Sequence, residues 1–263
     1  MQELTSGSWE WCTKAGHPYL TTTLLNRWPH GFFTRGSWPQ TPEVLSQQLA
    51  PEAVIYRAQQ VHGNRVLSPD DFSQGPSTTP DSRPSADAVM PTGSQQAAWV
   101  CTADSTPVLI GDVATGQVAA VHAGWRGTAL RIVPTTIVKM QAQGSELKNL
   151  RIAMGPAIAG RVYQVSTQVA TEVGRSLSLP AQSDAALVAH LQTLEPAPLL
   201  PDTEPGRLRL DVRQINALQL LTLGLEPQQV AIAPHCTYQE PDRFFSYRRS
   251  HEKKVQWSGI VSC

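Results

Sequence analysis

The pattern of apolar and polar positions predicts buried strands in the middle of the chain. Three short apolar runs, at residues 97–103, 108–112 and 118–121, are rich in small and β-branched side chains and are separated by turn residues. Runs of this kind between turn signals are typical of strands that are covered on both faces. Because Ala114-Thr115-Gly116 joins the second run to the third, we predict that these two strands form a hairpin.

Weaker patterns extend this picture to both ends of the chain. Loose alternation over residues 9–25 favours a hairpin, and strand-like composition recurs at 53–61, 150–156, 207–211, 230–233, 244–249 and 259–261. Helical spacing occurs at 42–49, 128–140, 165–177, 184–194 and 211–223. Pro134 should either kink the helix over 128–140 or restart it with the proline at its first position. Strands and helices do not alternate regularly, so we predict an α+β fold with a mixed or antiparallel sheet core.

Length and composition favour one globular unit. The chain has 263 residues, of which 41% are apolar and 16% are charged, and this composition can bury a sizeable core. We therefore predict a single domain over residues 1–263. Two stretches rich in proline and polar residues, near 68–85 and 178–206, are expected to be exposed loops.

Charge and targeting patterns disfavour several kinds of partner. Lys+Arg and Asp+Glu both number 21, so the formal net charge is zero and no global field attracts nucleic acid or anionic lipid. No apolar run approaches the length of a membrane span, and the first thirty residues lack the pattern of a secretory signal. We expect a soluble, cytoplasmic protein. The four cysteines are scattered without a CxxC motif, so neither a disulfide framework nor a zinc knuckle is indicated.

Candidate chemistry gathers where the predicted strands end. His62 and His122 each end a predicted strand close to a glycine, and Ser105 follows the strand at 97–103. Each residue alone has an ordinary explanation, as a core histidine or a turn serine. The two histidines together are more informative, because zinc binding and general acid–base chemistry both need imidazoles that converge from rigid elements. Arg35, beside a glycine turn, could present its guanidinium to an anion, although most arginines are simply exposed.

Three motifs carry a resemblance to a known family. They are Gln60-Val61-His62-Gly63, Thr102-Ala103-Asp104-Ser105-Thr106-Pro107-Val108-Leu109 and Val121-His122-Ala123-Gly124-Trp125-Arg126-Gly127. Smaller matches support them: residues 30–35, Gly155-Pro156 with Tyr163, Asp211 with Asn216, and residues 245–249. With these motifs in this order, the chain resembles the YfiH-like, laccase-domain family of purine nucleoside phosphorylases, whose members were first named polyphenol oxidases.

The resemblance implies a fold, an activity and a site. It implies a single layered α-β-β-α domain with one pocket lined by a histidine, a cysteine and a second histidine. Family members are similar in phosphorolysing adenosine, inosine, guanosine and S-methyl-5'-thioadenosine, and in deaminating adenosine, with zinc at the His/Cys/His site. Carried onto this chain, the catalytic residues and zinc ligands are His62, Ser105 and His122. The implied substrates are a purine nucleoside and phosphate, and Arg35 and Arg126 are our candidates for holding the phosphate, since guanidinium groups bind oxyanions in a bidentate manner.

Ser105 departs from the family pattern, which has cysteine at this position. A serine hydroxyl stays protonated near neutral pH and should hold zinc much less well than a thiolate does. Cys101 cannot simply substitute, because it lies four residues earlier on an extended strand, roughly 13 Å away. Natural divergence and an introduced exchange would both produce this difference. We therefore expect a weakened zinc site in this chain, with impaired activity as one consequence.

Two other classes of function stay open. A hydrolase could use Ser105 as its nucleophile, with His62 or His122 as the base. A protein that binds nucleotides without catalysis is favoured if the serine is native. A copper polyphenol oxidase is disfavoured, because several copper ions need many histidine ligands and the chain has seven scattered histidines.

Overall fold

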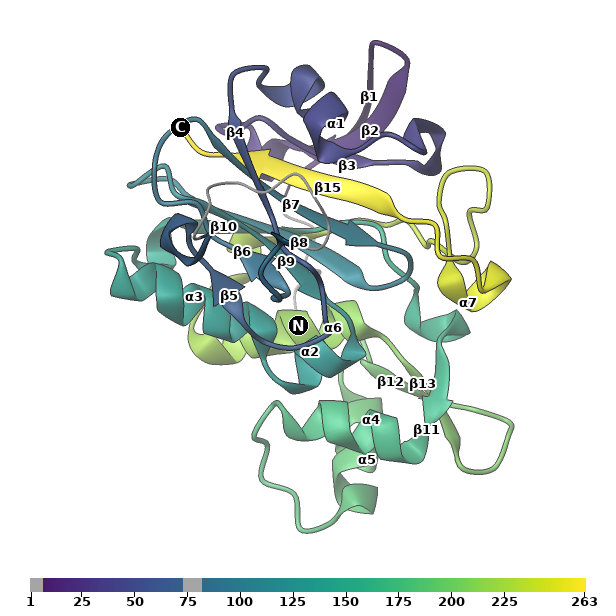
Figure 1. The fold of residues 1–263 in the computed structure, drawn as a ribbon. Coiled ribbons are helices and arrows are strands. Elements are labelled where there is room, and N and C mark those ends of the chain that lie inside the picture. The colour runs from purple at the N-terminus through teal and green to yellow at the C-terminus, as the bar shows by residue number, and fades with distance from the viewer. Residues whose placement is uncertain (1–6, 73–81) are drawn as a thin grey trace.

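Two six-stranded sheets pack face to face, with helices on their outer sides (Figure 1). The computed structural model describes residues 7–72 and 82–263. Part of the loop expected near 68–85 therefore lies outside the described residues, and its described part includes the short 3-10 helix Pro69–Asp71.

The first sheet brings together strands from the two halves of the chain. Its strand order is β1-β2-β3-β15-β7-β4, with β4 parallel to β7 and the other pairs antiparallel. Its strands are β1 (Trp9–Lys14), β2 (His17–Thr22), β3 (His30–Phe33), β4 (Val54–Arg57), β7 (Gln96–Thr102) and β15 (Gln256–Val261). Helix α1 (Pro42–Leu49) covers its outer face, where Leu45 packs with Phe33 and Trp99.

The second sheet contains the hairpin that the apolar runs predict. Its order is β14-β10-β8-β9-β6-β5, and β8 pairs antiparallel with β9 so that Pro107 lies opposite His122. Its strands are β5 (Val66–Leu67), β6 (Ala88–Val89), β8 (Thr106–Asp112), β9 (Val118–Ala123), β10 (Leu150–Met154) and β14 (Val230–Ile232). Because β14 runs parallel to β10 while β8 runs antiparallel to it, the sheet is mixed, as predicted.

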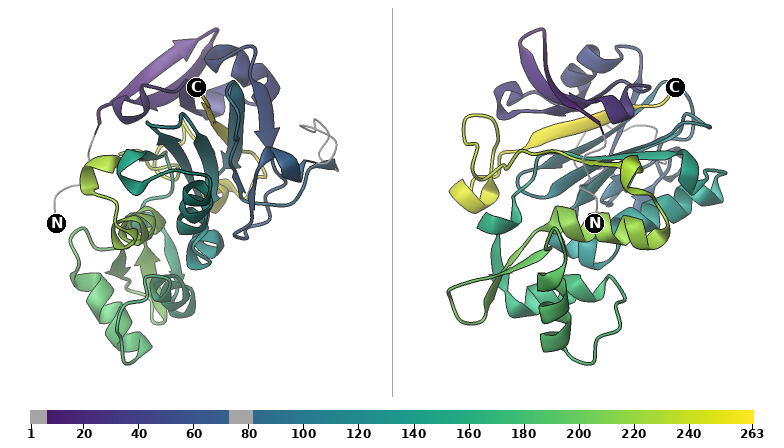
Figure 2. Two further views of the ribbon diagram at one scale, coloured as in Figure 1. Left: turned by 90° about the vertical axis from the view of Figure 1, so that its left-hand side faces the viewer. Right: turned by 180° about the vertical axis from the view of Figure 1, so that it is seen from behind.

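Alternate side chains of the second sheet fill two separate cores, because successive residues of a strand point to opposite faces. Leu109 and Ala120 belong to the core shared with the first sheet, whereas their neighbours Ile110 and Val121 pack with helices. The helices on this side are α2 (Trp125–Ala129), α3 (Ile132–Ala142) and α6 (Val212–Leu223). The layered α-β-β-α order that the resemblance implies is therefore confirmed, as the two further views also show (Figure 2).

A smaller unit of three strands and two helices extends from one side of this sandwich (Figures 1 and 2). Its elements are β11 (Gln164–Ser166), β12 (Leu199–Pro201), β13 (Arg207–Leu210), α4 (Thr167–Arg175) and α5 (Asp184–Thr193). Most of the segment near 178–206 is exposed, as predicted, and α5 confirms the helix expected at 184–194. The segment is not only a loop, however, because it also contains the strand β12, which was not predicted. Leu187, Leu191 and Leu199 are buried in the core of the smaller unit. The prolines on either side of α5 produced the loop-like pattern.

Several helix ends follow the capping residues in the sequence. Asp211 caps α6 by accepting hydrogen bonds from backbone N–H groups of its first turn, and Gly224 ends the helix with a left-handed φ of 107°. Ser166 caps α4 in the same way, through its hydroxyl and the N–H of Val169. The short helix α1 begins with Pro42 directly after Thr41, as its sequence predicts.

Pro134 lies in a helix that restarts. Helix α2 ends at Ala129, Arg131 adopts a left-handed φ of 60°, and α3 begins at Ile132. One of the two alternatives predicted from the sequence is a restart with the proline at the first helical position. In the structure, Pro134 is the third residue of α3. Both positions are tolerated, because the first turn of a helix has no intrahelical acceptor for its N–H groups.

The strand expected at 244–249 is wrong. Residues 247–250 form the short helix α7 (Tyr247–Ser250), in which the Ser246 hydroxyl accepts a hydrogen bond from the N–H of Arg249. No helix in the described part of the chain is long and apolar enough to cross a membrane.

Candidate active site

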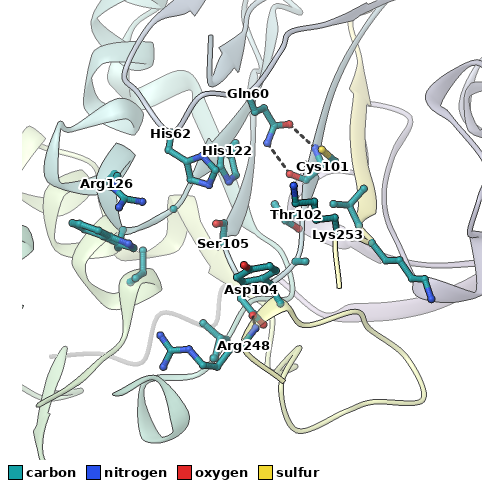
Figure 3. A pocket seen from close by; sticks show the side chains of 18 of the residues that line it. Gln60, His62, Cys101, Thr102, Asp104, Ser105, His122, Arg126, Arg248 and Lys253 are labelled. Atoms are coloured by element: carbon teal, nitrogen blue, oxygen red, sulfur yellow. Dashed lines mark hydrogen bonds between the residues drawn. The ribbon is translucent and has the colours of Figure 1, made fainter. Parts of the chain in front are cut away.

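A cavity of about 600 Å³ gathers the residues that the sequence singles out (Figure 3). The turn from β7 to β8 supplies Asp104 and Ser105, strand β9 supplies His122, and the segment after β4 supplies His62. Helix α7 and the residues that follow it contribute a further wall. The three residues predicted to be catalytic therefore line one cavity.

His62, Ser105 and His122 converge around Gly124. A Cβ atom placed on Gly124 would lie 2.9 Å from Ser105 Oγ, 3.6 Å from His62 Cδ2 and 3.7 Å from His122 Nε2. The two imidazole rings have centres 4.9 Å apart and are nearly perpendicular, at 83°. The missing side chain of Gly124 thus leaves a small space that all three groups face.

Asp87, which the sequence reading did not identify as a functional residue, holds both histidines. Its Oδ1 accepts hydrogen bonds from His122 Nδ1 at 2.8 Å and from the backbone N–H of His62 at 2.9 Å. Its Oδ2 accepts from the N–H groups of Gly63 at 2.6 Å and Val61 at 3.2 Å. Burial would raise the pKa of Asp87, but the hydrogen bonds, that of His122 foremost, outweigh burial and lower it. An ionised Asp87 requires the proton of a neutral His122 on Nδ1, so Nε2 presents its lone pair to the cavity.

His62 lies in a turn and not at the end of a strand as predicted. Strand β4 ends at Arg57, and His62 adopts a left-handed φ of 61°. Consecutive N–H groups bound to Asp87 stabilise this unusual conformation. Burial lowers the pKa of His62, and so does repulsion from the His122 ring when that ring carries a second proton. The imidazole is therefore neutral at pH 7 and can accept a proton or bind a metal ion.

A second buried aspartate, Asp104, joins Ser105 to helix α7. It has a left-handed φ of 95°, and its carbonyl oxygen accepts the N–H of Ile158 at 3.0 Å. Its Oδ1 accepts the hydroxyl of Thr237 and its Oδ2 accepts the backbone N–H of Arg248, both at 2.7 Å. These bonds fix the turn that presents Ser105 and place Arg248 at the cavity at the same time.

Arg126 and Arg248 line the cavity, each lying over an aromatic ring. The guanidinium carbon of Arg126 is 4.4 Å from the centre of the Trp125 ring, and that of Arg248 is 4.6 Å from the centre of the Tyr163 ring. The sequence predicts a phosphate-binding role for Arg126. It predicts no such role for Arg248, although residues 245–249 contribute to the family resemblance.

Arg35, the other arginine predicted to hold phosphate, is not among the residues that line the cavity. Its guanidinium lies 4.8 Å from the centre of the Phe245 ring and donates a hydrogen bond to the carbonyl oxygen of Pro241. The structure therefore does not bring Arg35 together with Arg126 and the histidines.

Cys101 lines the cavity, and its backbone is hydrogen-bonded to the side chain of Gln60. The side-chain amide of Gln60 donates to the carbonyl oxygen of Cys101 and accepts its N–H, both at 2.8 Å. Burial raises the pKa of the Cys101 thiol to about 11, so it remains protonated at neutral pH. It does not replace the thiolate that is missing at Ser105.

These donors fit a zinc ion poorly. Two imidazoles and a neutral hydroxyl face the space at Gly124. Within residues 7–72 and 82–263, no group of three or more His, Cys, Asp or Glu side chains could hold a metal ion. Asp87 is already bound to His122 and to backbone N–H groups. The site therefore lacks the third strong ligand that the resemblance implies.

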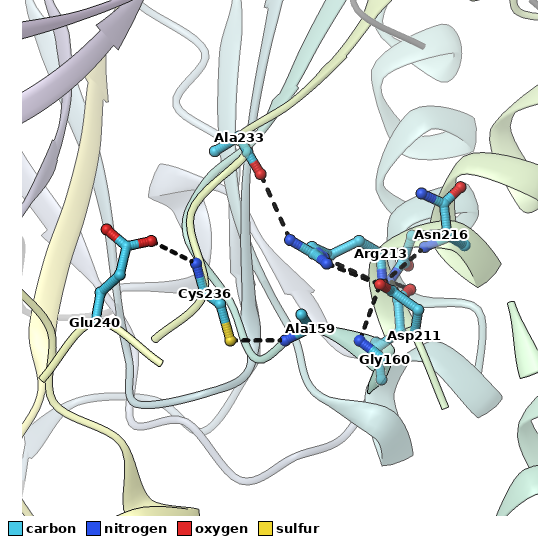
Figure 4. A network of polar contacts seen from close by, with 10 residues as sticks. Ala159, Gly160, Asp211, Arg213, Asn216, Ala233, Cys236 and Glu240 are labelled. Atoms are coloured by element: carbon cyan, nitrogen blue, oxygen red, sulfur yellow. Dashed lines mark hydrogen bonds and ion pairs between the residues drawn. The ribbon is translucent and has the colours of Figure 1, made fainter. Parts of the chain in front are cut away.

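A polar network holds another wall of the cavity (Figure 4). Asp211 accepts the N–H of Gly160 at 3.0 Å, and the sulfur of Cys236 accepts the N–H of Ala159 at 3.3 Å. Both contacts fix the segment next to Ile158, which lines the cavity. We interpret Asp211 and Cys236 as residues that support the site without facing it.

Comparisons with known proteins agree with the motifs. Residues 41–261 match a family model described as multi-copper polyphenol oxidoreductase laccase. A purine nucleoside phosphorylase from Synechocystis sp. is 52% identical over 256 residues, which cover 97% of each chain. Another from Corynebacterium glutamicum is 32% identical over 213 residues, covering 81% of this chain and 75% of the relative.

Solved structures share the fold. The hypothetical protein YfiH of Bacillus licheniformis superimposes with a TM-score of 0.80 at 23% identity, covering 96% of this chain and 99% of the other. YlmD from Geobacillus stearothermophilus gives a TM-score of 0.79 at 23% identity, covering 96% and 98%. The family match over most of the chain, and the fold that accompanies it, show that this protein belongs to the YfiH-like, laccase-domain family.

Proposed function

We propose that this chain phosphorolyses purine nucleosides in the cavity lined by His62, Ser105 and His122. The convergence of two imidazoles and a hydroxyl on the space at Gly124 carries this proposal. Relatives named purine nucleoside phosphorylase, one of them 52% identical, support it. The substrates we propose are adenosine, inosine, guanosine and S-methyl-5'-thioadenosine, together with phosphate.

The reaction requires one bond to form and one to break. A phosphate oxygen bonds to the anomeric carbon of the ribose while the bond from that carbon to the purine nitrogen breaks. The electron pair of the broken bond leaves with the purine, which needs a proton or a hydrogen bond to depart. The products are a sugar 1-phosphate and a free purine.

The residues around Gly124 include both a proton acceptor and a hydrogen-bond donor. His122 is a proton acceptor, because Asp87 holds its other nitrogen in the protonated form. The Ser105 hydroxyl keeps its proton at neutral pH and can donate a hydrogen bond to the departing purine. The His62 ring has a lowered pKa and faces the same space through its Cδ2 edge, so a neutral imidazole lines the place where the substrate would lie.

We propose that zinc belongs to a cysteine form of the site. In a Ser105→Cys variant, the introduced thiolate together with His62 and His122 would hold a zinc ion. The ion would supply a Lewis acid that activates water for the deamination of adenosine. Adenosine deamination is therefore proposed to depend on the restored thiol more strongly than phosphorolysis does.

The test compares the protein with its Ser105→Cys variant. We expect about one zinc per chain in the variant and much less in the parent, measured by mass spectrometry of the metal content, because thiolate is the stronger ligand. Release of base from inosine and adenosine is measured with and without phosphate, and ammonia release from adenosine in parallel. A Cys101→Ser variant is the matched control and should leave the zinc content unchanged.

Each outcome of this comparison has a defined meaning. If neither the parent nor Ser105→Cys releases base in a phosphate-dependent manner, the proposed phosphorolysis is wrong. If the variant gains neither zinc nor turnover, the assignment of zinc to a thiolate site is wrong. If nucleosides bind without turnover in either protein, the chain is a non-catalytic binding protein.

The spatial arrangement of Asp87, His122 and Ser105 favours a hydrolase as a second candidate function. A carboxylate orients an imidazole whose free nitrogen faces the same small space as a hydroxyl, which is the arrangement of an activated serine nucleophile. An electrophilic phosphonate probe should then label Ser105. Absence of labelling, or labelling that persists in Ser105→Ala, would exclude this candidate.

Copper chemistry is a weaker candidate, in spite of the description of the family model. The cavity lining contains three histidines, His62, His122 and His251. A multicopper site needs many more imidazole ligands than that. Copper content and phenol oxidation by the purified protein test this point directly.

A further inference from the structure

We propose that Arg126, Arg248 and Tyr163 form the subsite that binds inorganic phosphate. The inference rests on the proposed phosphorolysis for the role of the ion, whereas the site itself stands on the geometry of the cavity. Arg248, and not Arg35, is then the second arginine that would bind phosphate together with Arg126.

Both guanidinium groups are held in a way that leaves donors free. Each lies over an aromatic ring, Arg126 at 4.4 Å and Arg248 at 4.6 Å from the ring centre, so the contact uses the flat face of the group. The N–H donors lie on the edge of a guanidinium and remain available for an oxyanion. Arg248 Nη1 donates to the carbonyl oxygen of Gln164 at 2.7 Å, and no hydrogen-bond partner of its Nε or Nη2 lies within the described ranges.

Neither arginine is neutralised by a close carboxylate. No acidic oxygen of the described residues lies within 4.0 Å of the guanidinium nitrogens of Arg126 or Arg248. Of the acidic residues that line the cavity, Glu252 pairs with Lys254 at 2.9 Å. The other, Asp104, uses both of its oxygens for the Thr237 hydroxyl and the N–H of Arg248. The cavity therefore has an excess of positive charge beside the histidines.

Tyr163 supplies a third donor in the same cavity, where its ring lies 4.6 Å from the guanidinium carbon of Arg248. Burial raises the pKa of its phenol, and the charges of Arg248 and Arg126 oppose this rise. The phenol keeps its proton at neutral pH and can donate to a phosphate oxygen. Three donors that line one cavity suit a tetrahedral oxyanion, whose oxygens can pair with arginines.

The position of Arg248 connects this subsite to the reacting groups. Its backbone N–H is bound by Asp104, the residue directly before Ser105. Figure 3 shows the two histidines on one side of Ser105 and Arg248 on the other, with Arg126 near His62. A phosphate bound to Arg248 would thus lie across Ser105 from the histidines, which leaves the space at Gly124 to the nucleoside, as a reaction between two substrates requires.

The test measures binding of inorganic phosphate to the 263-residue chain by isothermal calorimetry. Arg248→Met should weaken binding roughly 10- to 100-fold, because charge-assisted hydrogen bonds are lost, and Arg248→Lys should recover part of the affinity. Tyr163→Phe should weaken it roughly 3- to 10-fold. Arg35→Met is the matched control, since Arg35 also lies over an aromatic ring but outside the cavity, and it should bind phosphate as the parent does. Far-ultraviolet circular dichroism verifies that each variant is folded.

Several results would overturn the subsite. Wild-type affinity in both Arg248→Met and Arg126→Met would do so, as would an equal loss in Arg35→Met, which would indicate a general effect of surface charge. A 5'-phosphorylated nucleoside is titrated in parallel. If that nucleotide binds in an Arg248-dependent manner while inorganic phosphate does not, the arginines recognise a nucleotide and the proposal is wrong.

The subsite and the proposed function fail in different ways. Arginine-dependent phosphate binding without release of base from any purine nucleoside would refute the phosphorolysis and leave the subsite intact. Phosphorolysis whose KM for phosphate is unchanged by Arg248→Met would support the function and refute the subsite.

Discussion

Asp87 and Asp104 hold the two ends of the cavity through different partners. Asp87 binds the ring of His122 and three consecutive backbone N–H groups around His62. Asp104 binds one hydroxyl and the backbone N–H of Arg248, and does not touch the guanidinium. Both carboxylates are buried, so their cost of desolvation must be balanced by the bonds that they accept.

This difference matches the task of each end. A reacting imidazole needs a defined tautomer, which a direct bond from ring to carboxylate provides. An arginine that binds an anion needs its charge to stay available, and a carboxylate bound to its guanidinium would compete with the ligand. Asp104 avoids this competition by holding the main chain of Arg248 and not its side chain.

The largest effect is expected at the histidine end, from Asp87→Asn. The amide cannot accept from four N–H groups at once, and it leaves the tautomer of His122 undefined. We expect kcat of phosphorolysis to fall roughly 10²- to 10⁴-fold, the upper end being the loss seen when the carboxylate of a catalytic triad is changed in this way. The free energy of unfolding should fall by about 3 kcal/mol, measured by urea denaturation, because a buried pair loses one partner.

Asp112→Asn is the control for this change. Asp112 is also buried, but its carboxylate caps the β8–β9 turn by accepting the N–H groups of Ala114 and Thr115. It should lower stability without a comparable loss of kcat. A kcat near the parent value in Asp87→Asn would mean that the aspartate has a purely structural role.

A smaller and different effect is expected at the arginine end, from Asp104→Asn. The amide offers one acceptor oxygen to the two donors that Asp104 binds, so the bond to the backbone N–H of Arg248 is weakened, at a cost of about 1 kcal/mol, and the KM for phosphate should rise roughly 5-fold. The value of kcat should change less than it does in Asp87→Asn. Steady-state kinetics with varied phosphate separate the two parameters. An equally large loss of kcat in both variants would remove the distinction between the two ends.

The smallest effect is a shift in the titration of His62, followed by NMR of its ring protons. Burial and the His122 charge place its pKa below the ordinary histidine value, and Arg126 lowers it further while Asp87 raises it. Asp87→Asn should therefore move the midpoint down, and Arg126→Met should move it up. Because the folded state binds this proton less readily than the unfolded chain, His62 contributes stability above the ordinary histidine pKa that is lost as the pH falls through the lowered value. Midpoints that move in the opposite directions would contradict this account of the charges.

The sequence is most informative where one local pattern decides the outcome. The strands β7, β8 and β9 follow from apolar runs that are buried on both faces, and α6 follows from Asp211 and Gly224 at its two ends. The strand β12 is missed among its prolines, because the burial of Leu199 depends on packing with α4 and α5 in the smaller unit.

The site residues divide in the same manner. His62, His122 and Ser105 are found because motifs surround them. Asp87 has a single local signal, a charged residue inside the small apolar run Ala86-Asp87-Ala88-Val89-Met90. Its partners lie 25 and 35 residues away, and those contacts exist only in the folded chain. The roles of Asp87 and Arg248 therefore require the structure.

The contacts of Asp87 also tie the chemistry of the site to the folding of the whole chain. The segment that carries His62 has no strand of its own to hold it, and it is ordered by an aspartate beside β6, which in turn pairs with β9. Neither imidazole can reach its place until these three distant segments have docked. The entropy of arranging the site is therefore spent during folding and not when a substrate arrives. Refolding should consequently restore the catalytic arrangement in the same step as the native sheet, without an inactive species that has the complete sheet.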